Sequence, residues 1–253
     1  MTVQSVDRAL SILELLGEYP DGTGLISISK ELNLPKSTTH RLIQSLVAKN
    51  FVIQDTENDR YRLSMKFVTL SSGLIENLDI RRIARPFIEK LATKVNEVIH
   101  LCILDGHEVV YIDKVESNRT MRMYSQIGKR ALLHCTGVGK MIMSGMSNEE
   151  IKVIATSSQL PKFTPTTITT EVSLLNEIEA IRKSGYSLDR EEHEEGIYCI
   201  AAPIYDYTNN VIAAFSISGP SERVKYDIES GNHIALIMET SNKISEMLGY
   251  KRG

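Results

Sequence analysis

Leu34-Pro35-Lys36-Ser37-Thr38-Thr39-His40-Arg41-Leu42-Ile43-Gln44-Ser45-Leu46-Val47 is the stretch that decides the fold of the first part of the chain. Proline is tolerated at or just before the start of a helix, so we predict a helix from about Lys36 to Lys49. One stripe of side chains at helical spacing is expected to face inward: Thr39, Leu42, Ile43, Leu46 and Val47. The opposite face carries hydrogen-bonding side chains at positions i, i+3, i+4 and i+7: Ser37, His40, Arg41 and Gln44. The helix is therefore expected to be buried on one side and polar on the other.

Two helices are expected before this one. Residues 5–18 form the first, with Ser5 suited to cap its start, and Val6, Leu10, Leu13 and Leu16 (or Leu15) on its apolar face. A loop at 21–24 follows. The second helix is predicted near residues 27–33, with Ser27 as its cap and Ile28 and Leu32 facing inward, until Asn33-Leu34-Pro35 breaks it.

A β-hairpin is predicted after the third helix, from residues 51–54 and 60–63 around a turn at 55–59. We expect Phe51, Ile53, Tyr61 and Leu63 to share one face, with Arg60 and Arg62 on the other. Three short helices followed by a basic hairpin predict a winged helix-turn-helix within residues 1–64.

The recognition helix of such a unit presents its first turns to base edges in the major groove of double-stranded DNA. Arginine can bond guanine with two hydrogen bonds and glutamine can do the same for adenine, whereas hydroxyls and first-turn amides suit phosphate oxygens. The expected DNA contacts are therefore Lys36, Ser37, Thr38, His40, Arg41, Gln44, Arg60 and Arg62. The alternative is that Arg41 and His40 are ordinary surface residues of a packing domain.

The charge distribution fits a polyanionic partner for this region. The whole chain has a net charge of −3, but residues 30–66 hold seven basic and four acidic residues, a local charge of +3 that leaves −6 elsewhere. A basic stretch in an acidic protein can mark a nucleic-acid footprint. The other interpretation is a solvated charged face.

The rest of the chain indicates a linker and a second domain. We expect a helix at about 65–78 with an apolar stripe, linker helices over 65–85, and a further domain over 86–253 that starts with a helix from Pro86 to Val95. Apolar runs at 98–104 and 108–113 flank Asp105-Gly106, a strong hairpin signal. Further strands are expected at 121–126, 197–204 and 211–218, and helices at 137–145, 148–155, 171–184 and about 234–248. The second domain is therefore expected to be mixed α+β with a largely antiparallel sheet.

Composition excludes several classes of protein. Of the 253 residues, 42% are hydrophobic and 24% are charged, close to the globular average, so the chain is not expected to be disordered. No apolar run approaches the length that spans a bilayer, and no signal pattern opens the sequence, so we expect no membrane association and a cytoplasmic location. Three widely spaced cysteines fit a reducing compartment and argue against a disulfide scaffold.

The chain resembles the IclR family of bacterial transcriptional regulators. Residues 6–63, with Leu34 to Leu42 at their centre, resemble the DNA-binding half of that family. The segments at 128–140, 185–192, 195–204 and 216–220 resemble its effector-domain signature. Residues 96–101, 122–128 and 194–196 most resemble the KdgR branch, which represses sugar-acid catabolism and responds to 2-keto-3-deoxygluconate. The resemblance implies a winged helix-turn-helix joined to a GAF-like effector domain.

The resemblance also implies a small-molecule pocket at one end of the sheet. Its expected contacts are the backbone of Gly137 and Val138 and the side chains of Asp189, Cys199, Ser216 and Ser218, with an apolar wall from Met123, Ala131 and Ile197. Free amides at a helix start suit a carboxylate. Ser216 and Ser218 lie two apart on a predicted strand and would share one face. The plainer interpretations are that Cys199 is a small buried hydrophobe and that the serines are satisfied within the sheet.

Three motifs in the sequence suggest other functions. Gly137-Val138-Gly139-Lys140 is not a phosphate-binding loop, because that loop needs glycine at His134 and serine or threonine at Met141. Asp189, His193, Glu194 and Cys199 could hold zinc by residue type. A pair of Cys135 with His134, or Cys199 with His193, lacks an identifiable orienting group. An enzyme or a metal-dependent sensor acting on keto acids is thus the alternative, although we expect no enzyme and no cofactor.

A regulator of this kind is expected to act as a symmetric dimer, or as a dimer of dimers, because one small DNA-reading unit contacts only a half-site. Residues 65–78 are a candidate dimer surface, or they pack onto their own winged helix. An effector changes operator affinity only if it binds the two conformational states differently, and the linker around 65–90 would transmit that difference.

Overall fold

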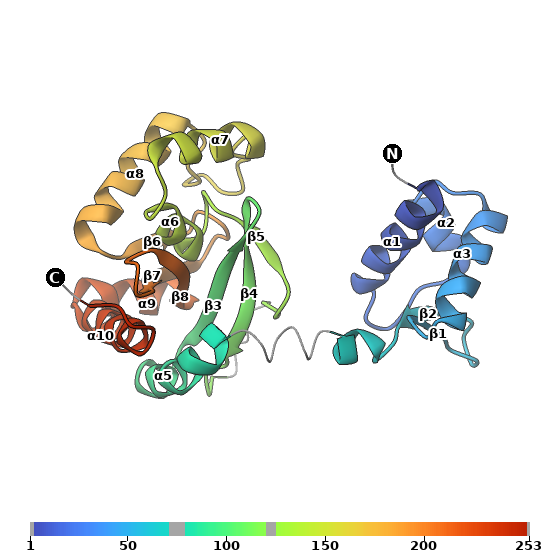
Figure 1. Ribbon diagram of the computed structural model, residues 1–253, viewed down its shortest axis with the longest axis horizontal. Coiled ribbons are helices and arrows are strands. Elements are labelled where there is room, and N and C mark those ends of the chain that lie inside the picture. Colours follow the sequence, from blue (N-terminus) through green and yellow to red (C-terminus); the bar gives the residue numbers. More distant parts are fainter. Residues whose placement is uncertain (1–2, 71–78, 120–124, 252–253) are drawn as a thin grey trace. The chain divides into compact units, whose positions relative to one another are not determined.

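The computed structural model describes residues 3–70, 79–119 and 125–251 (Figure 1). The chain forms two compact units, Met1–Asn77 and Leu78–Gly253. The division between them falls inside the segment that was expected to link two domains.

The first unit is a helical domain with a two-stranded sheet. Its elements are α1 (Gln4–Gly17), α2 (Leu25–Glu31), α3 (Lys36–Ala48), β1 (Val52–Gln54) and β2 (Tyr61–Leu63). The helices pack around one core of Ile12, Leu16, Ile28, Ile43, Val52 and Tyr61. The predicted winged helix-turn-helix is confirmed.

Local hydrogen bonds hold α2 and α3 in their helix-turn-helix arrangement. Leu34 N donates to Ser29 O at 2.9 Å, and Ser29 Oγ donates to Leu34 O at 2.6 Å, which closes the turn. Asn33 takes a positive φ of 51° in this turn, a conformation that asparagine tolerates better than most residues. The helix α2 begins two residues before the predicted start, with Gly24 rather than Ser27 at its N-cap.

Three side-chain predictions for this unit were wrong. Ser5 does not cap α1, because it lies inside the helix, whose N-cap is Val3. On α1 the buried positions are Ile12 and Leu16, while Val6 and Leu10 are exposed. In the hairpin, Ile53 pairs with Arg62 and points outward with it, whereas Val52 is buried. The register is set by an additional bridge between Tyr61 and Thr23 in the loop before α2, which buries Tyr61 and so directs the alternate positions outward.

The predicted helix at 65–78 is described only in part. Residues 66–70 are helical, and Phe67 packs edge-on against Phe51 at 5.4 Å between ring centroids. Lys66 Nζ lies 4.3 Å from the centre of the Phe51 ring. This turn of helix therefore packs onto its own winged helix. Residues 71–78 lie outside the described residues.

The second unit has one six-stranded sheet with helices on both faces. Its helices are α5 (Asp79–Val95), α6 (Gly137–Met143), α7 (Asn148–Ser158), α8 (Glu171–Ser184), α9 (Ser221–Glu229) and α10 (Asn232–Met247). Its strands are β3 (Val98–Asp105), β4 (Glu108–Val115), β5 (Arg130–Leu132), β6 (Ser187–Arg190), β7 (Ile197–Tyr205) and β8 (Val211–Pro220). The order is β5-β4-β3-β8-β7-β6 and every neighbouring pair is antiparallel, as expected.

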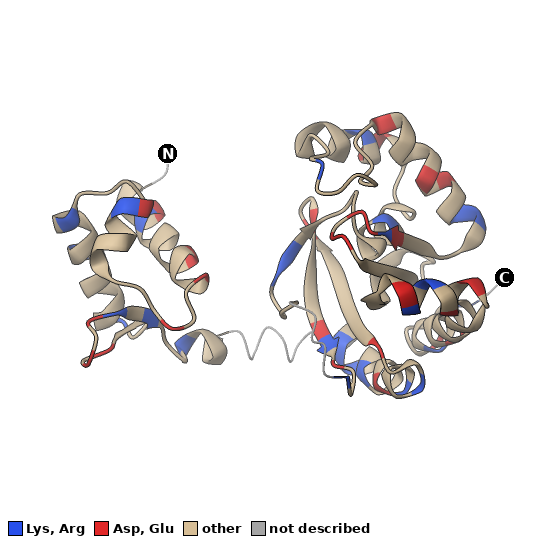
Figure 2. Ribbon diagram, turned by 180° about the vertical axis from the view of Figure 1, so that it is seen from behind, with Lys and Arg blue, Asp and Glu red and all other residues tan. Residues whose placement is uncertain are grey.

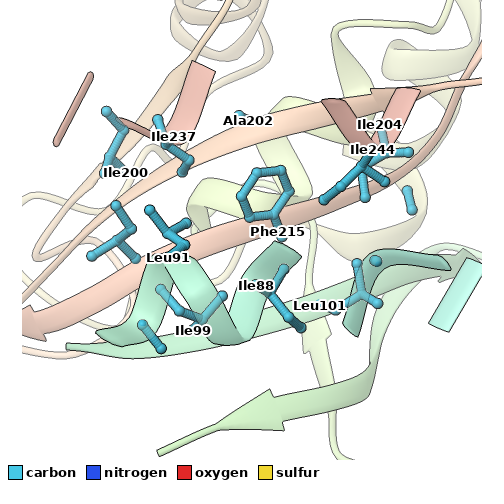
Figure 3. Close-up of a cluster of buried hydrophobic side chains, with 14 of the residues drawn as sticks. Ile88, Leu91, Ile99, Leu101, Ile200, Ala202, Ile204, Phe215, Ile237 and Ile244 are labelled. Atoms are coloured by element: carbon cyan, nitrogen blue, oxygen red, sulfur yellow. The ribbon is translucent and has the colours of Figure 1, made fainter. Parts of the chain in front are cut away.

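The alternation of side chains along the strands builds two cores. On one face, α5, α9 and α10 cover Ile99, Leu101, Ile200 and Phe215 (Figure 1). Figure 3 shows Phe215 in the middle of this cluster, with Ile88 and Leu91 of α5 among the neighbouring side chains. On the other face, α6, α7 and α8 cover the second core, which includes Cys102, Ala201 and Ala214. Polar side chains at one end of this second face surround the cavity described below.

Several predicted elements differ from the structure. Pro86 lies inside α5 rather than at its start; a proline at an interior position lacks the backbone N–H that the helix uses, and its ring crowds the preceding turn. Three elements were not predicted: β5, β6 and α9. The predicted strand at 121–126 falls mostly on residues 120–124, outside the described residues; Ser125 and Gln126 are not in a strand. Within the described ranges, no helix combines the length and hydrophobicity needed to cross a membrane.

Candidate functional site

The outer face of α3 presents the residues predicted to contact DNA. Lys36, Ser37, His40, Arg41 and Gln44 are exposed, and Thr38 is half-buried. The inner face holds Thr39 and Ile43, both fully buried. The two-sided helix predicted from the sequence is confirmed, so packing orients the polar face away from the core.

The start of α3 leaves backbone donors open. Its N-cap is Pro35, which makes no side-chain cap, and the first helical bond to this cap runs from Thr39 N to Pro35 O at 3.0 Å. The amides of Lys36, Ser37 and Thr38 therefore have no intrahelical acceptor. Open amides and the positive end of the helix dipole are a suitable environment for a phosphate oxygen.

The hairpin adds two exposed guanidinium groups, Arg60 and Arg62. Within the described part of the chain, neither of them forms an ion pair, and the same is true of Lys36 and Arg41. The acidic residues of the turn instead bond within the turn, where Asp55 accepts from Glu57 N and Asn58 Nδ2. Figure 2 shows the acidic turn and the basic positions next to it on this unit. The basic side chains remain available to an external anion.

A cavity of about 290 Å³ lies in the second unit, at the end of the sheet face covered by α6. Eight of the nine predicted effector residues line it: Ala131, Gly137, Val138, Asp189, Ile197, Cys199, Ser216 and Ser218. Met123, the ninth, lies outside the described residues. The structure thus brings together residues from β5, α6, β6, β7 and β8 that are far apart in sequence.

Strand pairing explains why these side chains meet. Asp189 pairs with Cys199, and Cys199 pairs with Ser218, so three strands contribute one row across the sheet. The next row on the same face joins Ser216 to His100 of β3. Because the rows lie two residues apart along β8, Ser216 and Ser218 face the same side, as predicted.

The serines belong to a longer chain of hydrogen bonds. Ser216 Oγ lies 3.0 Å from Ser218 Oγ, and Ser218 Oγ lies 3.3 Å from His100 Nδ1. The other ring nitrogen, His100 Nε2, lies 2.7 Å from Ser125 Oγ. Burial, and then the charge of nearby Lys114, lower the pKa of His100 to about 3. The imidazole is therefore neutral at physiological pH.

The start of α6 supplies amides to the cavity. Thr136 caps this helix by accepting from Gly139 N at 3.1 Å, which leaves the amides of Gly137 and Val138 without an intrahelical acceptor. Gly139 is required for the close packing here, because a Cβ on it would lie 2.4 Å from Leu133 O. The two open amides can donate to a carboxylate.

Asp189 is one of the acidic residues that line the cavity and is only 4% exposed. Its Oδ1 accepts from Glu192 N at 2.8 Å. Burial raises the pKa of Asp189 to about 7, despite this bond. The side chain can therefore accept from a ligand hydroxyl or donate to a ligand oxygen close to neutral pH.

Lys140 does not act as the lysine of a phosphate loop. Its side chain is fully buried, and Nζ lies 2.5 Å from Glu192 Oε1 and 3.1 Å from Glu177 Oε1. The loop that contains Glu192 is therefore held against α6 and α8 by these two ion pairs. The ammonium is thus committed to a structural ion pair.

The cysteines are poorly suited to nucleophilic catalysis. Cys135 Sγ lies 3.6 Å from His193 Nδ1, a pairing that the sequence did not suggest. Burial raises the pKa of Cys135 to about 12 and also raises that of Cys199, so both thiols stay protonated. Among the residues that the structure describes, no three His, Cys, Asp or Glu side chains are grouped to hold a metal ion.

Sequence reasoning missed several residues that line the cavity, among them Glu97, His100, Tyr111 and Arg223. Glu97 is buried and accepts two hydrogen bonds from Arg223, at 2.8 and 3.1 Å. The ring of Tyr111 stands edge-on to His100 at 5.1 Å between centroids. One signal could have identified His100: successive side chains of a strand point to opposite faces, so in the predicted strand at 98–104 His100 lies on the other face of the sheet from Ile99.

Comparison with known proteins identifies both units. The family model "IclR helix-turn-helix domain" matches residues 5–56, and "Bacterial transcriptional regulator IclR C-terminal" matches residues 72–246. The chain is 36% identical over 250 residues to the HTH-type transcriptional repressor AllR of Escherichia coli (strain K12), covering 98% of this chain and 91% of AllR. It is 35% identical over 249 residues to the HTH-type transcriptional regulator KdgR of Dickeya chrysanthemi, covering 98% of this chain and 81% of KdgR.

A solved structure shows the same architecture. The crystal structure of the Thermotoga maritima IclR superposes with a TM-score of 0.80 at 32% sequence identity, covering 98% of this chain and 99% of that one. Both units are therefore found together in one solved protein.

Proposed function

Because this chain belongs to the IclR family of bacterial transcriptional regulators, we propose that it represses sugar-acid catabolic genes and releases its operator when a small organic acid such as 2-keto-3-deoxygluconate binds. Its relatives are regulators of transcription, and AllR is a repressor. The sequence identities to AllR and KdgR are nearly equal, so they do not favour the effector of either relative. The chemistry of the cavity is therefore the basis for proposing an effector.

The gathering of the eight predicted effector residues in one cavity is the observation that supports the proposal most strongly. The amides of Gly137 and Val138 and the hydroxyls of Ser216 and Ser218 are donors for a carboxylate. Asp189 is an acceptor for ligand hydroxyls when it is ionised. A keto sugar acid has both kinds of group, and a cavity of about 290 Å³ holds a molecule of that small size.

DNA binding is assigned to the exposed face of α3 and the arginines of the wing. The side chains of Arg41 and Gln44 would read bases, and the open amides of the first helical turn would hold phosphate. A dimer would place two such faces on a pseudo-palindromic operator. Exposed apolar side chains on the first unit offer a surface for it: Val3, Val6, Leu10, Met65, Val68 and Leu70. A dimer of dimers would double the number of operator contacts.

The effector signal would pass through α5, which begins within the expected linker segment. Arg85 of α5 bonds Asp113 of β4, and the next residue, Lys114, donates from Nζ to Ser125 O at 2.9 Å. Ser125 bonds His100 at the cavity. This contiguous set of contacts joins the cavity to the first helix of the second unit.

Fluorescence anisotropy with labelled promoter fragments from the neighbourhood of the gene tests the proposal. At about 50 mM salt, where phosphate contacts are strong, we expect saturable binding to at least one fragment in preference to a scrambled sequence. 2-Keto-3-deoxygluconate should then weaken that binding. Gluconate, which lacks the keto group, and pyruvate, which lacks the hydroxyl chain, are the matched control acids. If the protein binds none of the fragments, the proposed function is contradicted.

A further inference from the structure

The hydrogen-bonded chain Ser125–His100–Ser218–Ser216, named here the serine–histidine relay, contains one group to which no function has been assigned. His100 is only 3% exposed, and both of its ring nitrogens bond hydroxyls. Ser216 and Ser218, at one end of the relay, face the cavity. The hydrogens along this relay therefore decide what the two serines offer to a ligand.

A neutral imidazole has a single N–H, so the relay has two directions. With the hydrogen on Nδ1, His100 donates to Ser218, Ser218 donates to Ser216, and the Ser216 hydroxyl is left to donate to a ligand. With the hydrogen on Nε2, His100 donates to Ser125, Ser218 donates to His100, and Ser216 is left to accept. The ring tautomer thus sets whether the serines present donors or acceptors.

The charge near Ser125 favours the first direction. Lys114 is the cross-strand partner of His100, and its Nζ lies 2.9 Å from Ser125 O. Hydroxyl and N–H dipoles orient in the local field, with their hydrogen ends away from a positive charge. Glu116 pairs with the same ammonium at 2.8 Å but is more than half exposed, so solvent screens its contribution. The hydrogens therefore point from Ser125 towards the cavity.

We propose that His100 is a specificity-determining residue that, as the Nδ1–H tautomer, directs the hydroxyl hydrogen of Ser218 at Ser216 and that of Ser216 at the ligand, and so selects a carboxylate oxygen over a neutral group. This proposal rests on the proposed function in one respect, because it assumes that the effector binds in the cavity. The relay itself exists without a ligand.

Histidine nitrogen NMR of the full-length, unliganded protein tests the relay directly. The ring signals of His100 are assigned by their loss in His100→Asn. We expect a neutral ring at pH 6 to 8 with the hydrogen on Nδ1. A hydrogen on Nε2, or a protonated ring at pH 7, would overturn the proposal.

Calorimetric titration with 2-keto-3-deoxygluconate and its amide tests the selectivity. Loss of a hydrogen bond to a charged group predicts that His100→Leu binds the acid about tenfold or more weakly, with a smaller loss for the amide. His100→Asn, whose amide can still donate to Ser218, should recover part of the preference. His107→Leu is the matched control, because His107 also bonds a serine, Ser157, but on the exposed β3–β4 turn.

The two tests separate this proposal from the proposed function. Equal acid-to-amide preference in wild type and His100→Leu would contradict the role of His100 even if the protein binds DNA and effector as proposed. If the wild type binds neither compound, the proposed effector is wrong, and the proposal for His100 is decided by the ring tautomer alone.

Discussion

Arg85 Nη1 lies 2.7 Å from Asp113 Oδ1 and so joins α5 to β4, the strand that also contributes Tyr111 to the cavity. The Asp113 side chain is fully buried, and Arg81 Nε approaches its second oxygen at 3.4 Å. A buried carboxylate needs such partners, because ionisation away from water is otherwise costly. The position of α5 is therefore tied to the charge of Asp113.

Arg85→Ala should destabilise the second unit. We expect the free energy of unfolding to fall by about 1–3 kcal/mol, because Asp113 loses its shorter ion pair while Arg81 remains. Lys243→Ala, which breaks an exposed pair with Glu239, should leave the free energy of unfolding nearly unchanged, because solvent screens this pair. Denaturant unfolding of both variants measures the difference, and equal stabilities would show that Arg85 is not needed to hold Asp113.

Arg41→Ala should weaken operator binding and relax base preference. Loss of a bidentate arginine–guanine contact predicts about 1–3 kcal/mol of lost affinity for the specific site, with a smaller effect on random DNA. Lys152→Ala, an exposed lysine on α7, is the control of equal charge change. Anisotropy titrations against an operator and a scrambled fragment give both affinities. Unchanged discrimination in Arg41→Ala would remove α3 as the base-reading helix.

Arg62→Ala should change the salt dependence of binding rather than its sequence preference. A phosphate contact releases condensed counterions, so the slope of log affinity against log salt should become shallower by about one. Titrations between about 50 and 200 mM salt measure this slope. A slope equal to that of the wild type would place the wing away from the DNA backbone.

Asp189→Asn should alter the pH dependence of stability. The pKa of Asp189 is about 7 in the folded protein against an ordinary value of 3.8, so the folded state holds the proton more tightly. The contribution of this group to stability is therefore present at low pH and is lost as the pH rises towards about 7.

The asparagine variant cannot ionise, so its stability relative to wild type should increase between pH 5 and pH 7, by at most about 1.4 kcal/mol per pH unit. The comparison of two proteins cancels the opposite contribution of His100, whose lowered pKa favours the folded state as pH rises to its ordinary value. Parallel pH profiles of Asp189→Asn and wild type would contradict the buried environment of Asp189.

Elements with strong local signals were predictable from sequence. The helix α8 spans Glu171–Ser184, as predicted, because Thr170 caps its start and Gly185 takes the positive φ of 79° that ends it. The antiparallel hairpin β3–β4 followed from Asp105-Gly106, where Gly106 has a φ of 63°. The polar face of α3 and the shared face of Ser216 and Ser218 followed from periodicity alone.

Elements that depend on tertiary pairing were not predictable in the same way. The strand β6 has four residues, two of them charged, and is held in place by β7, so no local pattern marks it. The outward position of Ile53 depends on the bridge from Tyr61 to Thr23, far away in sequence. His100 was missed because its hydrogen bond to Ser218 forms only when β8 pairs with β3.

The effect of ligand on operator affinity in Ser216→Ala/Ser218→Ala is the most direct test of the central claim, that a metabolite cavity controls a DNA-binding face. Saturating 2-keto-3-deoxygluconate should weaken operator binding by the wild type by about 5- to 150-fold, the usual range of allosteric coupling. The double variant should bind the operator as tightly as the ligand-free wild type and should not respond to the acid. A double variant that releases DNA as readily as the wild type would contradict the account.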